Sequence, residues 1–417
     1  MGLFDNEEKQ QRVLLVSVDT GEYDAQSSLD ELWELTESAG ATPIATMTQK
    51  KDKPETATYV GSGRLEEITD FCENNDIDLL IFDCELTPTQ IRNIEQATNV
   101  RTIDRTMLIL DIFALRAKSK EGKLQVELAQ LGYMLPRLTG KGIAMSRLGG
   151  GIGTRGPGET KLETDKRHIR RKMETLKEQL KEVETHRNML KNRRKKDGII
   201  TVAIVGYTNA GKSTLMNYLT TAGVLAEDKL FATLDPTSRA LKLPNGVSVM
   251  LIDTVGLVRR LPHHLVEAFK STLEEAALAD IILNVCDASS EEFELHLDVT
   301  NKLLAELGCN DRPIISVFNK CDLVGNPDDL PGGRETVRIC AKMGIGISEL
   351  LNAIEKNLPV RLRKFTLLVP FENASVIAAL RKSGALQSEE YTADGIKVEA
   401  VVEEPLWHLA EHYSINS

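Results

Sequence analysis

The fold of this chain is decided by the stretch Gly206-Tyr207-Thr208-Asn209-Ala210-Gly211-Lys212-Ser213. It lies between residues 199–205, a β-branched run that predicts a buried strand, and residues 214–219, which predict the start of a helix. A G-x-x-x-x-G-K-S pattern in this context indicates a phosphate-binding loop, because glycines let backbone N–H groups turn towards an anion at a helix N-terminus. An ordinary glycine turn is the alternative, and the flanking elements and the later motifs disfavour it.

Two residues of the loop and a second motif predict a magnesium-bound phosphate. Lys212 is expected to reach the β- and γ-phosphates, and the Ser213 hydroxyl to bind Mg²⁺. The second motif, Phe231-Ala232-Thr233-Leu234-Asp235, follows about 20 residues later. We expect Thr233 to complete the magnesium coordination while the γ-phosphate is present, and Thr237 is the competing candidate.

Two further motifs follow predicted strands over 247–252 and 314–318. In Asp253-Thr254-Val255-Gly256, Asp253 would hold Mg²⁺ through water and the Gly256 N–H would contact the γ-phosphate. In Asn319-Lys320-Cys321-Asp322, the carboxylate of Asp322 can accept two hydrogen bonds from the guanine N1–H and 2-amino group. Adenine offers no such pair, so this motif predicts selection of GTP over ATP.

The fifth motif, Cys340-Ala341-Lys342, follows a predicted strand over 336–339, and the Ala341 N–H would meet guanine O6. Each short motif alone is common. Five in order predict a GTPase of the translation-factor class, which hydrolyses GTP to GDP and phosphate.

The site departs from related GTPases at three positions. Leu257 stands where Ras-like enzymes have the glutamine that orients water, so intrinsic hydrolysis should be slow or rely on something else. Asn209 matches the position that helps to seat a monovalent cation in potassium-stimulated relatives. Our hypothesis is that potassium or an external partner supplies the missing stabilisation. Cys340 replaces the usual serine, with little expected harm because Ala341 supplies the key backbone contact.

Composition bounds the class of protein. The chain has 417 residues, which suggests about two to four domains, and a net charge of −11. Its six cysteines are scattered and form no C-x-x-C, as expected for reduced thiols of a cytoplasmic protein. The acidic N-terminus lacks a signal-peptide pattern, and no apolar run approaches the roughly 20 residues that span a bilayer.

The N-terminal part alternates strand and helix patterns. Strands are predicted over 13–18, 42–48 and 79–82, and helices over 27–39, 65–74 and 88–98, with Ser27 or Ser28 as the first N-cap. This alternation predicts a parallel α/β unit over residues 1–110. A helical pattern then runs over 105–138, and Pro136 is expected to stop it. The turn Gly61-Ser62-Gly63-Arg64 predicts either a plain tight turn or, less favoured, an anion site.

A basic arm is predicted next. A glycine-rich loop (147–159) precedes a charged helix over 161–196, whose apolar spacing indicates a helical hairpin or a coiled coil. Residues 136–197 hold 18 lysines and arginines against 8 acidic residues. That asymmetry favours contact with RNA phosphates, and a solvated, salt-bridged helix with a loose linker is the alternative. The candidate RNA contacts are Arg147, Arg155, Lys161, Arg193, Arg194, Lys195 and Lys196.

The order of motifs resembles the HflX family of ribosome-associated GTPases. The carrying residues are 124–131, 149–159, 206–213, 231–235 and 253–256, and the likeness covers about residues 10–360. It implies a protein that binds the large ribosomal subunit and separates stalled or idle ribosomes, with loop 149–159 near the peptidyl-transferase region. We expect the protein to be a monomer. ATP binding to the N-terminal part is also attached to the family, but this sequence carries no adenine-site motif.

The predicted fold class is α/β. A parallel α/β domain (1–110) and a helical arm (111–197) precede a P-loop GTPase domain with a mixed sheet flanked by helices (198–362) and a small α+β domain (363–417). Two other functions stay open: a regulatory GTPase switch whose arm docks a protein, and a ribosome-assembly module with incidental hydrolysis.

Overall fold

The computed structural model describes residues 10–138, 161–196, 198–220, 230–231, 237–260, 276–309, 311–326, 329–331, 335–359, 362–382 and 385–415. The chain forms two compact units. The first comprises residues 1–188, 227–235 and 260–270, and the second comprises the remainder. Among the described helices, none is long and apolar enough to cross a membrane. All six cysteines are free thiols.

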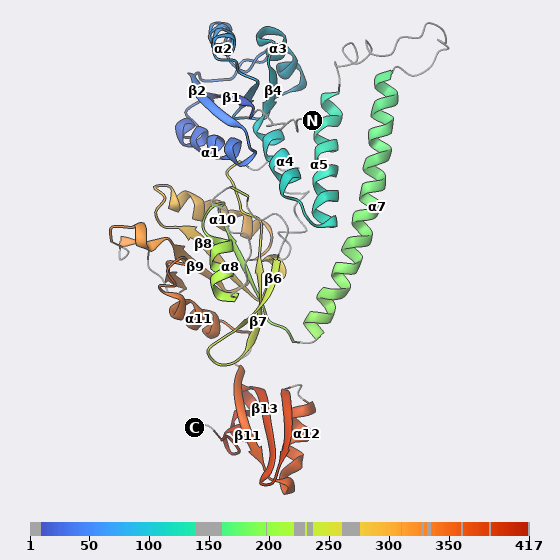
Figure 1. The fold of residues 1–417 in the computed structure, drawn as a ribbon, viewed down its shortest axis with the longest axis vertical. Coiled ribbons are helices and arrows are strands. Elements are labelled where there is room, and N and C mark those ends of the chain that lie inside the picture. The colour runs from blue at the N-terminus through green and yellow to red at the C-terminus, as the bar shows by residue number, and fades with distance from the viewer. Residues whose placement is uncertain are drawn as a thin grey trace, which may run out of the picture. The chain divides into compact units, whose positions relative to one another are not determined.

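The N-terminal sheet is parallel, as predicted, with the strand order β2-β1-β3-β4 (Figure 1). Its core is built from apolar side chains of β1 and β3, including Leu14, Val16, Leu80 and Phe82, which are fully buried. The elements are β1 (Arg12–Asp19), α1 (Ala25–Ser38), β2 (Thr42–Lys50), α2 (Ser62–Asn74), β3 (Leu79–Phe82), α3 (Pro88–Thr98) and β4 (Arg101–Asp104).

The structure differs from two predictions for this part in detail. Helix α1 begins at Ala25 because the carboxylate of Asp24 accepts hydrogen bonds from the backbone N–H groups of Gln26 and Ser27, so Asp24 is the N-cap. The helical pattern over 105–138 is two helices, α4 (Arg105–Arg116) and α5 (Lys120–Arg137). The chain becomes extended at Ala117 and Ser119 caps the second helix, while Pro136 lies inside the last turn of α5.

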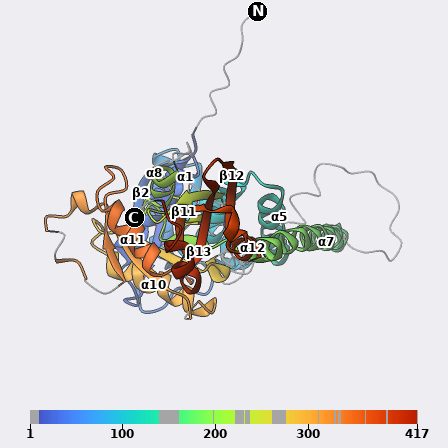
Figure 2. The same cartoon turned by 90° about the horizontal axis from the view of Figure 1, so that it is seen from below.

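The charged helix α7 (Lys161–Lys196) pairs with α5 as a helical hairpin, which confirms that prediction (Figures 1 and 2). Leu124 of α5 packs with Leu176 and Leu180 of α7. Ion pairs flank this apolar seam, from Arg187 Nη1 to Glu121 Oε1 at 2.8 Å and from Lys172 Nζ to Glu127 Oε1 at 2.5 Å.

The second unit contains a six-stranded mixed sheet in the order β10-β9-β8-β5-β7-β6. All its strand pairs are parallel except β6–β7, which places the antiparallel strand at one edge. The strands are β5 (Thr201–Gly206), β6 (Thr237–Lys242), β7 (Ser248–Asp253), β8 (Ile281–Asp287), β9 (Ile314–Asn319) and β10 (Thr336–Arg338); the helices are α8 (Lys212–Thr220), α10 (Phe293–Glu306) and α11 (Ile347–Lys356).

A small α+β module ends the chain. Its antiparallel sheet has the order β11-β13-β12, and α12 packs against these strands to close a separate apolar core (Figures 1 and 2). The elements are β11 (Leu362–Val369), α12 (Ala374–Lys382), β12 (Leu386–Thr392), β13 (Gly395–Glu403) and α13 (Trp407–Glu411).

Candidate nucleotide-binding site

The loop 206–213 joins the end of β5 to the first residue of α8, so its backbone turns at a helix N-terminus. Gly211 has φ +88°, and a Cβ there would lie 2.2 Å from Asn319 Nδ2. Asn209 also adopts a left-handed conformation, with φ +60°. This geometry explains why glycine is needed at position 211: the loop both turns left-handed and approaches a neighbouring side chain closely.

Lys212 is buried within this loop. Its Nζ donates to the carbonyl oxygens of Gly206 (3.1 Å) and Tyr207 (2.7 Å), so the ammonium group lies inside the curve of the loop. Burial lowers the pKa of Lys212 to about 8, and the nearby negative charge of Asp253 opposes this shift. A phosphate beside Lys212 would restore the charged form.

Ser213 and Asp253 form a pair of oxygen donors. The Ser213 hydroxyl donates to Asp253 Oδ2 at 2.9 Å, and Asp253 is fully buried at the end of β7. Hydroxyl and carboxylate oxygens are the ligands that Mg²⁺ prefers, so this donor set fits the metal. Thr237 lies at the start of β6 with its Cα opposite that of Asp253.

The segment after Asp253 continues alongside the phosphate-binding loop. The Thr208 N–H donates to the Leu257 carbonyl at 2.8 Å, and the Leu257 N–H donates to the Gly206 carbonyl at 3.2 Å. Gly256 is packed closely, since a Cβ there would lie 2.6 Å from Thr208 Cγ2 and 3.2 Å from Lys212 Nζ. The two loops predicted to hold the γ-phosphate are therefore in contact.

Asn319 connects the phosphate-binding loop with the loop that is predicted to bind the guanine base. Its Nδ2 donates to the Ala210 carbonyl at 2.8 Å, and its Oδ1 accepts from the Ala341 N–H at 2.9 Å. Burial, and a hydrogen bond from its thiol to Asp322, raise the pKa of Cys340. The fourth and fifth motifs therefore meet, with Asp322 itself exposed. Lys320 pairs with Asp287 at 2.7 Å.

The structure does not bring every predicted site residue to this loop. The ring of Phe231 is buried edge-on against Phe113 of α4, with the ring centroids 4.6 Å apart. The other residues of that motif (Ala232, Thr233, Leu234 and Asp235) lie outside the described residues, as do Arg147 and Arg155. Lys161, Arg193, Arg194, Lys195 and Lys196 belong to α7.

Sequence reasoning missed a cluster around Tyr207. The Tyr207 hydroxyl accepts from the Arg259 N–H at 2.7 Å, and its ring stacks on His296 with centroids 3.9 Å apart. The Arg259 guanidinium pairs with both carboxylate oxygens of Glu292, at 3.0 and 2.5 Å. No sequence motif connects these residues, so the cluster can be recognised only because the fold brings them together.

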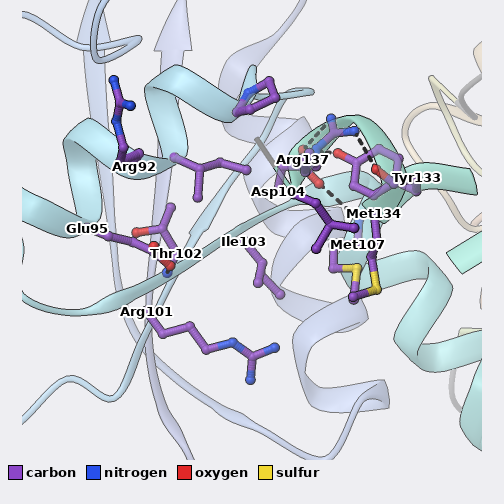
Figure 3. A pocket seen from close by; sticks show the side chains of 13 residues that line it. Arg92, Glu95, Arg101, Thr102, Ile103, Asp104, Met107, Tyr133, Met134 and Arg137 are labelled. Carbon is purple, nitrogen blue, oxygen red and sulfur yellow. Dashed lines mark hydrogen bonds and ion pairs between the residues drawn. The ribbon is translucent and has the colours of Figure 1, made fainter. Parts of the chain in front are cut away.

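The N-terminal part has a separate cavity of about 210 Å³, between α3, β4 and α5 (Figure 3). At one side, buried Asp104 accepts hydrogen bonds from the Tyr133 hydroxyl and from the backbone N–H groups of Leu86 and Met107. Burial raises the pKa of Asp104. Arg137 lies over the Tyr133 ring at 3.4 Å. These contacts hold Asp104, Tyr133 and Arg137 together, so the cluster has a structural explanation, although the buried Nε of Arg137 has no hydrogen-bond partner among the described residues.

Comparisons with known proteins agree with the geometry of the loop. Family models match three consecutive stretches: "GTP-binding GTPase N-terminal" over residues 26–114, "GTP-binding GTPase Middle Region" over 116–194 and "50S ribosome-binding GTPase" over 201–320. A protein named GTPase HflX from Caldanaerobacter subterraneus is 52% identical and covers 94% of this chain and 91% of its own length. The chain belongs to the GTPase HflX family.

Other members of the HflX family align over similar lengths. The relative from Lacrimispora saccharolytica is 49% identical over 97% of this chain and 96% of its own length. The relative from Escherichia coli is 37% identical over 94% of this chain and 93% of its own length. A solved structure of a GTP-binding protein from Sulfolobus solfataricus in complex with GDP is 25% identical, covers 83% of this chain and 98% of its own length, and has a TM-score of 0.45. Membership makes the chain a GTPase, a hydrolase that binds GTP and GDP.

Proposed function

We propose that this GTPase binds the large ribosomal subunit as a monomer and separates stalled or idle ribosomes when GTP is bound. The observation that carries the proposal is the α5–α7 hairpin with its row of cations. Arg170 and Arg171 of α7 are exposed, as are Lys177 and Lys181. Aromatic side chains suited to base stacking are nearly absent from residues 161–196, so contact with RNA would be to its phosphates and shape.

Further support comes from a family model. The stretch 201–320 matches a model described as a 50S ribosome-binding GTPase. Docking of a protein partner is the second candidate function, because solvated cations on a helix also suit an acidic protein surface. The two functions differ in what the arm must bind, and therefore in which partner a charge reversal would release.

Sedimentation with ribosomes tests the proposal. The full chain should pellet with large subunits in a non-hydrolysable GTP analogue and much less in GDP. Charge reversal at Arg193, Arg194, Lys195 and Lys196 to glutamate should abolish pelleting, because phosphate contacts dominate such binding. A matched reversal at exposed Lys50 and Lys53 is the control and should leave pelleting unchanged. Unchanged binding by the arm variant would exclude the arm as the ribosome contact.

For the reaction, we propose that Mg²⁺ is held by Ser213, with Asp253 acting through water, and that Thr233 completes the coordination. The 2.9 Å separation of the Ser213 and Asp253 oxygens supports this assignment. Lys212 would bind the phosphates and Asp322 the guanine base. When bound, the metal would neutralise charge on the phosphates. Because Leu257 cannot orient water, we propose that potassium near Asn209 or a bound partner raises turnover; equal turnover in NaCl and KCl would exclude potassium.

A further inference from the structure

Thr208 is a buried residue of the phosphate-binding loop, and its side chain is only 5% exposed. Its Oγ1 atom has no hydrogen-bond partner among the residues that the structure describes. A buried hydroxyl without a hydrogen bond costs free energy, and most buried polar side chains in proteins are paired. An exception within a nucleotide-binding loop indicates a group that is paired only when a ligand is bound.

The backbone of Thr208 is fixed against the segment that follows Asp253. Its N–H donates to the Leu257 carbonyl at 2.8 Å. A Cβ built on Gly256 would lie 3.0 Å from Thr208 Cα and 2.6 Å from Thr208 Cγ2, so Thr208 and Gly256 are in direct contact. All of these residues belong to the same compact unit.

The side chain of Thr208 lies next to both groups that are predicted to bind the γ-phosphate. The same built Cβ would lie 3.2 Å from Lys212 Nζ, so the Thr208 methyl group and the Lys212 ammonium group are both beside Gly256. Cγ2 and Oγ1 branch from one carbon atom and occupy staggered positions. A single rotation about the Cα–Cβ bond therefore brings the hydroxyl to the place of the methyl group, where it joins the Gly256 N–H and Lys212 as a third donor.

We propose that Thr208 is a specificity-determining residue whose hydroxyl donates a hydrogen bond to the γ-phosphate of GTP. The inference rests on the proposed assignment of Lys212 to the phosphates. GDP lacks the γ-phosphate, so only GTP can accept this bond. A hydroxyl that donates to an ionised phosphate oxygen forms a charge-assisted hydrogen bond, which is stronger than one between neutral groups. Thr208 therefore increases the affinity for GTP and leaves the affinity for GDP unchanged.

Calorimetric titration of the full chain with GDP and with a non-hydrolysable GTP analogue tests this proposal. Thr208→Val replaces the hydroxyl by a methyl group of similar shape. We expect this variant to bind the analogue about tenfold more weakly, which corresponds to about 1.4 kcal/mol, and to bind GDP within twofold of the original chain. Thr208→Ser keeps the hydroxyl and should bind both nucleotides within twofold. Thr300→Val is the matched control: Thr300 is a buried threonine of α10 whose hydroxyl donates to the His296 carbonyl at 2.9 Å, and its loss should change neither affinity.

Thermal unfolding without nucleotide separates a contact to the ligand from a role in the fold. Because the Thr208 hydroxyl is unpaired in the free protein, Thr208→Val should unfold at the same temperature as the original chain or at a higher one. A lower unfolding temperature would show that the hydroxyl serves the fold, and it would overturn the proposal. Unchanged analogue affinity in Thr208→Val, or an equal loss of analogue and GDP affinity, would overturn it as well.

Lys212→Ala distinguishes failure of this inference from failure of the site on which it rests. That variant should bind both nucleotides much more weakly than the original chain. If it binds GDP normally, the assignment of Lys212 is wrong and the proposal for Thr208 falls with it. If Lys212→Ala loses both nucleotides while Thr208→Val binds the analogue normally, only the role of Thr208 is excluded. The ribosome takes no part in these measurements, so their outcome is independent of the proposed ribosomal function.

Discussion

At the scale of single residues, Asn319 and Lys212 carry most of the organisation of the site. Asn319 uses both atoms of its amide to join Ala210 in the phosphate-binding loop to Ala341 in the base-binding loop. Lys212 is buried and donates to carbonyls of its own loop. The identity of both residues follows from sequence motifs, but the bridging role of Asn319 does not, because its two partners lie far from it in the chain.

The buried ammonium group predicts a pH dependence. Lys212 in the free protein loses its proton near pH 8, whereas a bound phosphate favours the charged form and raises this pKa. Below pH 8 the affinity for GDP should therefore be flat; above it, binding requires proton uptake, and the affinity should fall by up to roughly tenfold per pH unit. Calorimetry between pH 7 and 9 checks this. Lys212→Arg stays charged and should show no slope; the same slope in both proteins would exclude Lys212 as its source.

The base-binding loops give a second prediction. Asp322→Ala should weaken GTP binding by about 10–100-fold, because two hydrogen bonds to a charged acceptor are lost, and should abolish the preference over ATP. Cys340→Ser should bind like the original chain, since a hydroxyl can donate to Asp322 as the thiol does. Competition of GTP and ATP against a fluorescent nucleotide measures both. Retained guanine preference in Asp322→Ala would overturn the assignment.

At the scale of elements, the α5–α7 hairpin depends on a narrow apolar seam. Leu176→Ala should destabilise the pairing by about 2 kcal/mol, the lower end for a buried leucine, because few apolar neighbours surround it. Hydrogen exchange of α5 and α7 amides should accelerate in that variant. Met189→Ala, at an exposed position of the same helix, should leave exchange unchanged. Equal protection in both variants would show that the seam contributes little.

The prediction of strands from the sequence succeeded where an apolar run directly precedes one of the nucleotide-binding motifs. The predicted bounds of the strands before the first, third and fourth motifs agree with the observed bounds to within two residues, because each apolar run ends at a glycine or a polar residue. Strands β4 and β6 were missed because most of their residues are polar and neither contains an apolar run. Strand β8 was also missed: it is a mostly apolar, buried run, and periodicity alone cannot distinguish such a run from a buried helix.

At the scale of the whole molecule, the chain does not divide into its units as simply as the motifs divide the sequence. The first unit gathers three separate stretches of chain, and two of them lie within the predicted GTPase domain. Asp83 and Arg260, which form one of its ion pairs, are 177 residues apart in sequence. No local pattern reports such a pairing, so the sequence-based boundaries at 110, 197 and 362 stay predictions.

This interleaving limits how the polypeptide can be dissected. A fragment cut after residue 197 would lose Leu230, whose N–H donates to Ser38 Oγ, and Phe231, which covers Phe113. It would also lose Arg260, whose guanidinium pairs with Asp83. Such a fragment would leave the Phe113 ring exposed, and the complementary fragment would carry Phe231 without its packing partner Phe113. Experiments on either half alone would therefore use a protein whose normally buried surfaces are exposed. Point substitutions in the intact chain avoid this problem.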